Sequence, residues 1–464
     1  MNHPPIEPQP APAAVRPDLP RKIGFWGAMA VLVGVVIGSG IFRTPTTIAQ
    51  NLGSPWLILA MWAVGGLVAL CGALTFAELA GRFPHSGGVY VFLREAYGRG
   101  IAFVFGWTYM LVTKPAAAGG IAFIFAEHLN TLTGQSFNPA ITTCIALFVL
   151  TLINVVGVRG STQFAIAVTT LKYVAILGVI VLGVFAALRA LSGDTSAHFQ
   201  SLPPPRPFID ALIPVMSAIM WTYDGWADVG SIAGEVKEPR RTLPRVYIWG
   251  TLSVMFLYLL ANAVYLWHIP LAEMAQTKTV APLLLERLVG PIGSTLVTVL
   301  IIISTLGSSH ASVMTGARVT FAQARDGLLF DFLARVDPRF QTPAIALWIQ
   351  LALSCIAVIW LGGFTALADS FVFTMWIFYG LGAVALFIIR ARESKRKSAI
   401  SQLDEPLAYR VPLYPIVPGI FVLASAAMTV LAIRDDPQTT LIWGGVLLAG
   451  IPVYIGWSSW RNQS

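Results

Sequence analysis

The stretch VVIGSGIFRTP, residues 35–45, decides how the rest of the sequence is interpreted. It lies within a run that is otherwise apolar enough to cross a bilayer. Gly38, Ser39 and Gly40 are poor helix formers, and Arg43 and Pro45 follow closely. Lipid cannot hydrogen-bond to the backbone groups that a break in a helix sets free. We therefore expect the chain to unwind here, with protein, water or a bound molecule lining the break.

The composition is that of an integral membrane protein. Of the 464 residues, 56% are hydrophobic and only 11% are charged, and the mean hydropathy is +0.73. Soluble chains average about 25% charged residues, and a membrane span needs about 20 predominantly apolar residues. The sequence predicts an all-α membrane protein with twelve transmembrane helices, at residues 24–51, 54–80, 101–127, 139–158, 162–188, 208–233, 246–267, 292–322, 343–361, 364–390, 413–432 and 438–459.

The remaining residues predict no soluble domain. Residues 1–22 are proline-rich and predict a disordered cytoplasmic tail rather than a signal peptide, ahead of one membrane domain over residues 23–462. The three cysteines fall in expected spans and the six histidines are scattered, so no disulfide framework, metal site or cofactor is predicted. With the N-terminus inside, most of the 30 lysines and arginines lie on the cytoplasmic side. This bias is typical of a multi-pass membrane protein and argues against a nucleic-acid partner.

A second motif, TYDGW at residues 222–226, interrupts the sixth expected span much as GSG interrupts the first. The two spans begin roughly 184 residues and five spans apart, so the second set of five would be inserted upside down. Paired broken helices in two inverted halves indicate a transport site. The half-helix beginning near Ile41 would point its positive N-terminus at an anion, while freed carbonyls and Asp224 would suit a cation. Such a site suits a zwitterion; taken alone, GSG is equally consistent with close helix packing.

Motifs along the whole chain beyond residue 22 resemble the amino acid–polyamine–organocation superfamily of transporters, and its L-type amino acid transporter branch in particular. The matching stretches are GVVIGSGIF (34–42), FAELAGRFPHSGGVYVFLREAYG (76–98), KPAAAGGIAFIFAEHL (114–129), TTLKYVAILG (169–178), WTYDGW (221–226), EVKEPRRTLPR (235–245), STLGSSHASVMTGARVTFAQARDG (304–327) and YRVPLYPIVP (409–418). The resemblance implies a five-plus-five inverted repeat, with discontinuous helices 1 and 6. Repeat one would cover about 24–190 and repeat two about 208–390, with helices 11 and 12 at about 413–459.

The resemblance also implies a substrate site built from the two breaks. Backbone N–H groups of the first break hold the substrate carboxylate, and backbone carbonyls hold the amino group. An aromatic residue before the second break gates the site, and here it is Trp221, where many relatives of this branch carry Phe; a bulkier indole would favour small substrates. The implied substrate-binding residues are Val36, Gly38, Ser39, Gly40, Ile41, Trp221, Thr222 and Asp224.

Lys172 is the most informative charge inside a span, because ionisable groups there are costly and mark function by default. The resemblance implies that it replaces a sodium ion beside the first break, which makes transport sodium-independent; a structural prop is the alternative. Lys114 has a structural or pairing role as its first interpretation, and His310 that of a packed polar residue. Arg43 is predicted to face the external vestibule or to pair with an acid such as Asp369.

These patterns predict no catalytic residue and no enzyme. The expected function is secondary transport of neutral L-α-amino acids by sodium-independent exchange, with proton-coupled import or carriage of cationic amino acids or polyamines as alternatives. The expected partners are the amino acid and the lipid bilayer. The resemblance implies that related animal proteins bind a heavy chain through a cysteine in the external loop between spans three and four. The corresponding loop here, EHLNTLTGQSFNP, contains no cysteine, so no disulfide-linked heavy chain is expected. We expect a multi-pass protein of the plasma membrane, in a bacterium the inner membrane, with both termini cytoplasmic.

Overall fold

The computed structural model describes residues 19–189, 201–397 and 409–463. Regular structure within these ranges is helical, and the one β-contact there is a parallel bridge between Ile23 and Val236. The all-helical class is therefore confirmed. The tail predicted over residues 1–22 falls almost wholly outside the described ranges and stays a prediction.

The helices follow one another along the chain, with three segments of 3-10 or π geometry (η1–η3). They are α1 (Phe25–Val36), α2 (Gly40–Ala49), α3 (Pro55–Arg82), α4 (Val89–Tyr97), α5 (Arg99–Thr108), η1 (Tyr109–Thr113), α6 (Lys114–Thr133), α7 (Pro139–Val155), α8 (Val158–Arg189), α9 (Phe208–Tyr223), η2 (Trp226–Glu235), α10 (Pro239–His268), α11 (Leu271–Met274), α12 (Val280–Val289), α13 (Pro291–Arg325), η3 (Asp331–Ala334), α14 (Ala344–Leu361), α15 (Phe364–Lys397), α16 (Ile416–Asp435) and α17 (Pro437–Gln463).

Ten helices in the described ranges are long and apolar enough to cross a membrane, where the sequence predicts twelve. Two expected spans account for the difference. The one at 139–158 is helix α7, apolar but only 17 residues long, which is the lower limit for a span. The one at 208–233 is divided at its break into the 16 residues of α9 and the 3-10 segment η2, so neither piece alone has the length of a span.

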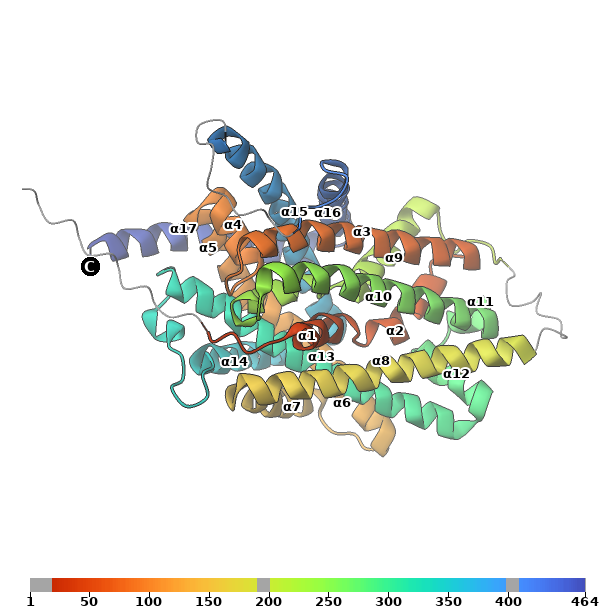
Figure 1. The fold of residues 1–464 in the computed structure, drawn as a ribbon. Coiled ribbons are helices and arrows are strands. Elements are labelled where there is room, and N and C mark those ends of the chain that lie inside the picture. Colours follow the sequence, from red (N-terminus) through yellow and green to blue (C-terminus); the bar gives the residue numbers. More distant parts are fainter. Residues whose placement is uncertain (1–18, 190–200, 398–408, 464) are drawn as a thin grey trace, which may run out of the picture.

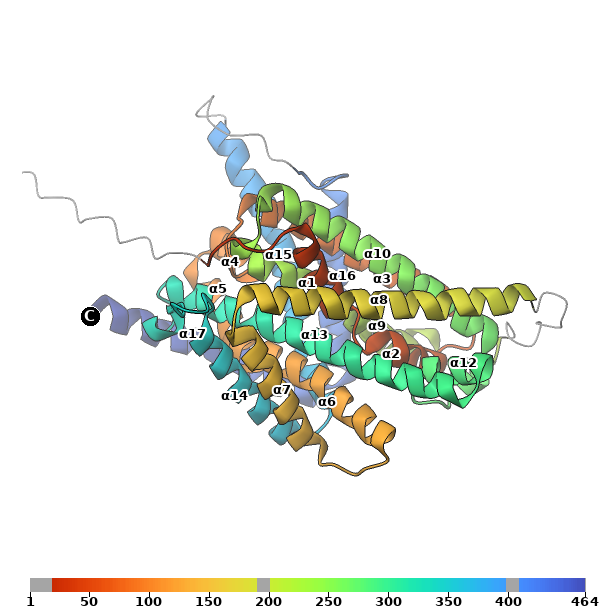
Figure 2. The ribbon, with the colours of Figure 1, turned by 60° about the horizontal axis from the view of Figure 1, so that its bottom comes forward.

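The long helices run side by side and enclose the interrupted ones (Figures 1 and 2). Helix α1 packs against α8, α10 and α13, and α2 packs against α9. The sequence analysis missed α4, α11 and α12, because these helices lie outside the expected spans and are at most 10 residues long. The first interruption is therefore held in the interior, where its backbone faces protein rather than lipid.

A buried ion pair fixes the end of η2 against α13. The Arg318 Nε atom lies 2.8 Å from an oxygen of Glu235, and its Nη1 atom donates to the Met314 carbonyl at 2.8 Å. Both charged side chains are at most 1% exposed. Charges so far from water are stable only when paired, so this contact holds the segment after the second break to a neighbouring helix.

We expect Glu235→Gln to lower the free energy of unfolding by about 3–5 kcal/mol, because it leaves the Arg318 guanidinium buried without a counter-charge. The unfolding temperature of the detergent-purified protein, followed by intrinsic fluorescence, measures the effect. Asp210→Asn is the control: it removes the Arg434–Asp210 pair, whose side chains are 60% and 49% exposed. That change should cost about 1 kcal/mol at most; equal shifts in the two variants would contradict the prediction.

Candidate functional site

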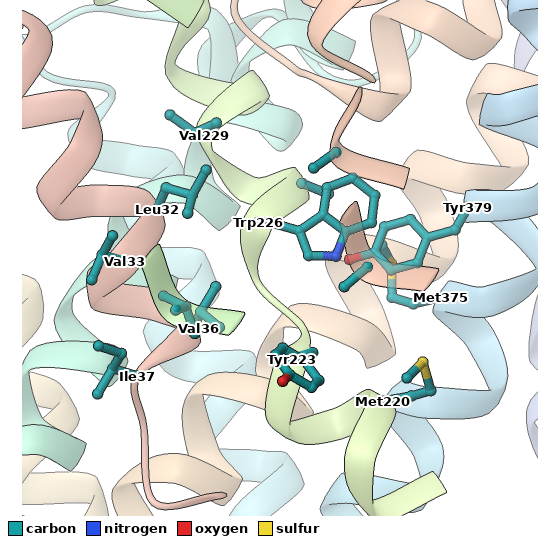
Figure 3. Packing of buried hydrophobic residues seen from close by; sticks show 14 of the residues in the cluster. Leu32, Val33, Val36, Ile37, Met220, Tyr223, Trp226, Val229, Met375 and Tyr379 are labelled. Atoms are coloured by element: carbon teal, nitrogen blue, oxygen red, sulfur yellow. The ribbon is translucent and has the colours of Figure 1, made fainter. Parts of the chain in front are cut away.

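The first helix is interrupted at the predicted GSG motif. Helix α1 ends at Val36 and α2 begins at Gly40, and residues 37–39 between them are not helical. No side chain caps the start of α2 at this gap. Figure 3 shows Val36 and Ile37 at the end of α1 and Tyr223 at the end of α9; the Val36 side chain lies on the side toward Tyr223, and the Ile37 side chain points away from it.

The second interruption follows directly after Tyr223. Gly225 has a φ of +108°, a backbone conformation that residues with a Cβ rarely adopt, and η2 begins at Trp226. A Cβ on Gly225 would lie 2.4 Å from the Cγ1 atom of Val35 in α1. The two breaks are therefore in contact with each other, and glycine is what lets them approach.

Backbone donors at the first break are left without protein partners. The N–H groups of Ser39, Gly40 and Ile41, at the start of α2, donate to no acceptor within the described residues. The first N–H groups of a helix carry partial positive charge and point along its axis. Together these three groups can bind an anion, and the carboxylate of a small molecule is of the right size.

Backbone acceptors at the first break, in contrast, are served by side chains of the protein. The Lys172 ammonium donates to the Gly34 carbonyl at 2.7 Å and to the Ile37 carbonyl at 2.6 Å. It also lies 3.0 Å from the hydroxyl of Ser308, and a hydroxyl from Ser304 reaches the Ile37 carbonyl at 3.1 Å. Lys172 is fully buried, so a cation that belongs to the chain holds the unwound carbonyls.

One predicted acceptor already has two partners. The Val36 carbonyl accepts from the N–H of Gly38 at 2.8 Å and from the hydroxyl of Tyr258 at 2.8 Å. A carbonyl oxygen has two lone pairs, so Val36 has no free one for a substrate in this conformation. The carbonyls of Thr222, Tyr223 and Asp224 at the second break accept no hydrogen bond within the described residues.

A small cavity lies between the two breaks, with a volume of about 40 Å³, room for only a few water molecules. Seven of the predicted binding residues line it: Val36, Gly38, Ser39 and Gly40 from the first break, and Trp221, Thr222 and Asp224 from the second. Ile41 does not line it with its side chain, and Lys172 contacts the backbone behind it.

Charged side chains in this cavity are paired or hydrogen-bonded. Lys114 at the start of α6 forms an ion pair with Asp228 of η2, with side chains only 4% and 7% exposed. The hydroxyl of Thr315 donates to the same carboxylate at 3.1 Å. The carboxylate of Asp224 accepts from the Tyr379 hydroxyl at 2.8 Å. The side chains of the cavity therefore contribute one cation and two anions, and Lys172 behind it contributes the second cation.

Aromatic side chains cover the cavity on the side of α9. Trp221 packs edge-on against Phe364 and Phe371, with ring centroids 5.7 and 5.2 Å apart. Arg43 lies over the Phe364 ring and within 3.7 Å of Glu127, so it pairs with an acid as predicted. The side chain of Asp369, the acid named in the prediction, lies outside the described residues. The Arg43 and Glu127 side chains are both about two-fifths exposed.

The sequence model of the amino acid permease family matches residues 23–456, nearly the whole chain. The chain belongs to this family. The resemblance found in the sequence is thereby confirmed, and with ten apolar helices the permease is a multi-pass membrane protein.

Curated relatives of this permease are transporters. The serine/threonine exchanger SteT of Bacillus subtilis is 30% identical, over 94% of this chain and 97% of its own length. The human b(0,+)-type amino acid transporter 1 is 29% identical over 94% of this chain and 88% of its own. The human cystine/glutamate transporter is 28% identical over 97% of this chain and 88% of its own.

Sequence reasoning missed several residues of the site. Asp228 lies four residues after Asp224 in the same expected span, and a second carboxylate at that depth was a signal that could have been used. The sequence indicated a pairing role for Lys114 without identifying its partner, and the structure shows that the partner is Asp228. Tyr258 and Tyr379 gave no signal, since a tyrosine in an apolar helix usually packs. His310 lies 3.1 Å from Ser161, outside the cavity lining, as a packed polar residue would.

We expect Gly40→Ala to weaken substrate binding by roughly tenfold or more. The added Cβ would lie 2.6 Å from the Thr222 Oγ1 atom, which is itself held 2.6 Å from the hydroxyl of Thr44. Relieving such an overlap costs about 1–3 kcal/mol, and 1.4 kcal/mol is tenfold in affinity. Equilibrium binding of a radiolabelled amino acid to purified protein measures the change.

Gly178→Ala in α8 is the matched control, because nothing lies within 4 Å of its added Cβ. It should bind substrate as the wild type does. Both variants should insert and purify in similar yield; comparable affinities in the two would show that the contact between the breaks is not needed for binding.

Proposed function

We propose that this permease exchanges small neutral L-α-amino acids across the plasma membrane, without sodium, by alternating access around the two breaks. One observation carries the proposal: across one small cavity, three backbone N–H groups of the first break and three carbonyls of the second break have no hydrogen-bond partner among the described residues. Donors on one side and acceptors on the other are complementary to a carboxylate and an ammonium group. Every α-amino acid carries both.

The substrate carboxylate would bind the N–H groups of Ser39, Gly40 and Ile41, and the ammonium group the carbonyls of the second break. Trp221 contributes a carbonyl that accepts one bond, from the Asp224 N–H at 3.2 Å, and so keeps a free lone pair. The Asp224 carbonyl accepts no hydrogen bond within the described residues, so its lone pairs are also available. Val36 supports the ammonium only if Tyr258 or Gly38 releases its carbonyl.

Charge balance favours a neutral substrate. Lys114 and Lys172 offset Asp224 and Asp228, so the buried side chains around the cavity have no net formal charge. A zwitterion adds none, whereas a cationic or acidic side chain would bring an uncompensated charge into a medium of low dielectric constant. The small cavity and the indole of Trp221 favour short side chains, and a relative named a serine/threonine exchanger agrees.

Lys172 supports independence from sodium. Its ammonium occupies the position between α1, α8 and α13 where two freed carbonyls and the Ser308 hydroxyl converge, which is a set of oxygen ligands that a metal cation would also accept. A cation fixed to the chain leaves no role for a dissolved one at this point.

The topology belongs to the same proposal. Twelve spans follow if α7 and the broken pair α9 and η2 also cross the bilayer, and the two breaks then occupy equivalent places in two inverted five-helix repeats. The charge bias of the sequence supports a cytoplasmic location for both termini. In a bacterium, the membrane that the permease spans would be the inner membrane.

Two alternatives keep the fold and change the cargo or the coupling. Deprotonation of Lys172 would make the permease a proton-coupled importer. Asp224, which lines the cavity with Tyr379 as a partner, would serve a cationic amino acid or a polyamine. Counterflow at several pH values distinguishes the first, and competition by arginine or putrescine the second.

A free carboxylate should be required for recognition. Bonds between charged groups and backbone donors are worth about 1.5–3 kcal/mol each, so losing one weakens binding roughly tenfold or beyond. In proteoliposomes loaded with unlabelled amino acid, alanine should compete with labelled substrate while alaninamide and alanine methyl ester should not. Equal competition by alanine and its amide would exclude the first break as the carboxylate site.

Lys172→Ala should insert and fold but lose most of its flux, because the Gly34 and Ile37 carbonyls lose their charged donor and keep only the hydroxyls of Ser304 and Ser308. Hydrogen bonds to charged groups are worth about 1.5–3 kcal/mol each. Lys172→Arg should rescue poorly, since a planar guanidinium does not fit a pocket shaped for a compact ammonium. Wild-type exchange should be the same in sodium and in choline. Wild-type rates in Lys172→Ala would reduce the lysine to a structural prop, and steep sodium dependence of the wild type would reveal another ion site.

A further inference from the structure

A groove of about 560 Å³ lies at the end of the bundle where α1 begins, well separated along α1 from the transport cavity. Three parts of the chain line it: Arg21 ahead of α1; Arg82, Pro84 and His85 at and just after the end of α3; and residues 238–241 at the start of α10. We propose that this groove binds a phosphate-bearing anion, most readily the headgroup of an anionic phospholipid.

The groove has an excess of positive charge. Arg82 is neutralised within the protein, since it pairs with Glu78 and Glu393. Arg21 and Arg241 are exposed, and their side chains donate to no acceptor within the described residues. Arg240 also lines the groove but already takes part in an interaction within the protein, so the available guanidinium groups are those of Arg21 and Arg241. Glu238 is the one acidic residue among the described residues of the lining. Guanidinium groups bind phosphate through paired hydrogen bonds, so this set matches a phosphate group in charge and in donors.

The start of α10 adds to this preference. Glu238 precedes the helix with a φ of +45°, and its side chain makes no capping hydrogen bond. The first turn contains no acidic residue but has Arg240 and Arg241. Positive side chains oppose the partial positive charge of a helix N-terminus. An anion between them would offset both, which explains why such an arrangement is tolerated.

Exposed tryptophans place the groove near the level of lipid headgroups. Trp26, five residues after Arg21, is 72% exposed, and Trp249 in α10 is 61% exposed. Trp249 follows Arg241 by eight residues, about 12 Å along a helix. Tryptophan is enriched at membrane–water interfaces, and the side chains of Pro84 and Pro239 give the groove an apolar wall. A lipid headgroup is therefore closer at hand than free phosphate.

Binding there would tie the start of α1 to the segment after the second break. Ile23 already bonds to this segment, with its N–H donating to Glu235 at 2.9 Å and its carbonyl accepting from Lys237 at 2.8 Å. An anion bridging Arg21 and Arg241 would add a second connection across the same junction. The proposed anion site depends on the groove alone, so its test does not depend on which substrate the permease transports.

The test uses the full-length purified permease with two probes: inorganic phosphate, and dihexanoyl phosphatidylglycerol below its micellar concentration, each titrated by isothermal calorimetry. Arg21→Gln/Arg241→Gln should weaken binding of the lipid probe about tenfold, the loss of at least one charge-assisted contact. Arg159→Gln/Arg245→Gln removes two exposed arginines that do not line the groove, and should bind as the wild type does. Both replaced pairs are exposed, so all proteins should share one unfolding temperature.

The two probes distinguish the source of the anion. Tight binding of the lipid probe and weak binding of phosphate, both reduced in the groove variant, supports a lipid headgroup. If inorganic phosphate binds as tightly as the lipid probe, and its binding is also reduced in the groove variant, the result supports a site for free phosphate. Probe affinities that are the same in the groove variant and in the control variant would overturn the proposal.

Discussion

A helix interrupted inside a bilayer must find partners for every backbone group that the break releases, and the site of this permease follows from that constraint. At the first break the chain treats acceptors and donors differently. Lys172, Ser304 and Ser308 serve the carbonyls of Gly34 and Ile37, while the N–H groups at the start of α2 have no partner within the described residues. The protein has thereby filled the half of the break that a cation would fill. The half that an anion would fill stays open.

The two breaks produce four helical segments, and these segments pack as two pairs. Helix α1 packs against η2, and the bonds of Ile23 to residues 235 and 237 fasten the far ends of these two segments. Helix α2 packs against α9, where the Thr44 and Thr222 hydroxyls are 2.6 Å apart and Gly40 allows the close approach. The cavity lies between the pairs. In the proposed alternating-access cycle, a movement of one pair relative to the other would open or close the cavity without separating the partners within either pair.

The sequence predicts what depends on composition and on local backbone preference. Gly38 and Gly40 are visible as a break because three poor helix formers stand together in an apolar span, and Lys172 is visible because a charge there is expensive. The contact of Lys114 with Asp228 is not visible in the sequence, because it joins residues that are 114 positions apart and that only the folded chain brings together. Tyr258 is hidden for the same reason: its role at the Val36 carbonyl depends on where α10 passes α1. Pairings that depend on packing need the structure.

The same pairings explain how a site with four charged residues could serve the neutral substrate proposed here. A dissolved sodium ion at the position of Lys172 would come and go with each cycle, and the cavity would change charge as it did so. An ammonium group on the chain cannot leave, so under the proposed role the balance among Lys114, Lys172, Asp224 and Asp228 is the same with the cavity open to either side. A zwitterion then enters and leaves without altering the charge buried in the membrane. If transport is independent of sodium, as proposed, the amino acid gradients alone would set the direction of the cycle. The cycle would be an exchange provided that the empty carrier does not change sides.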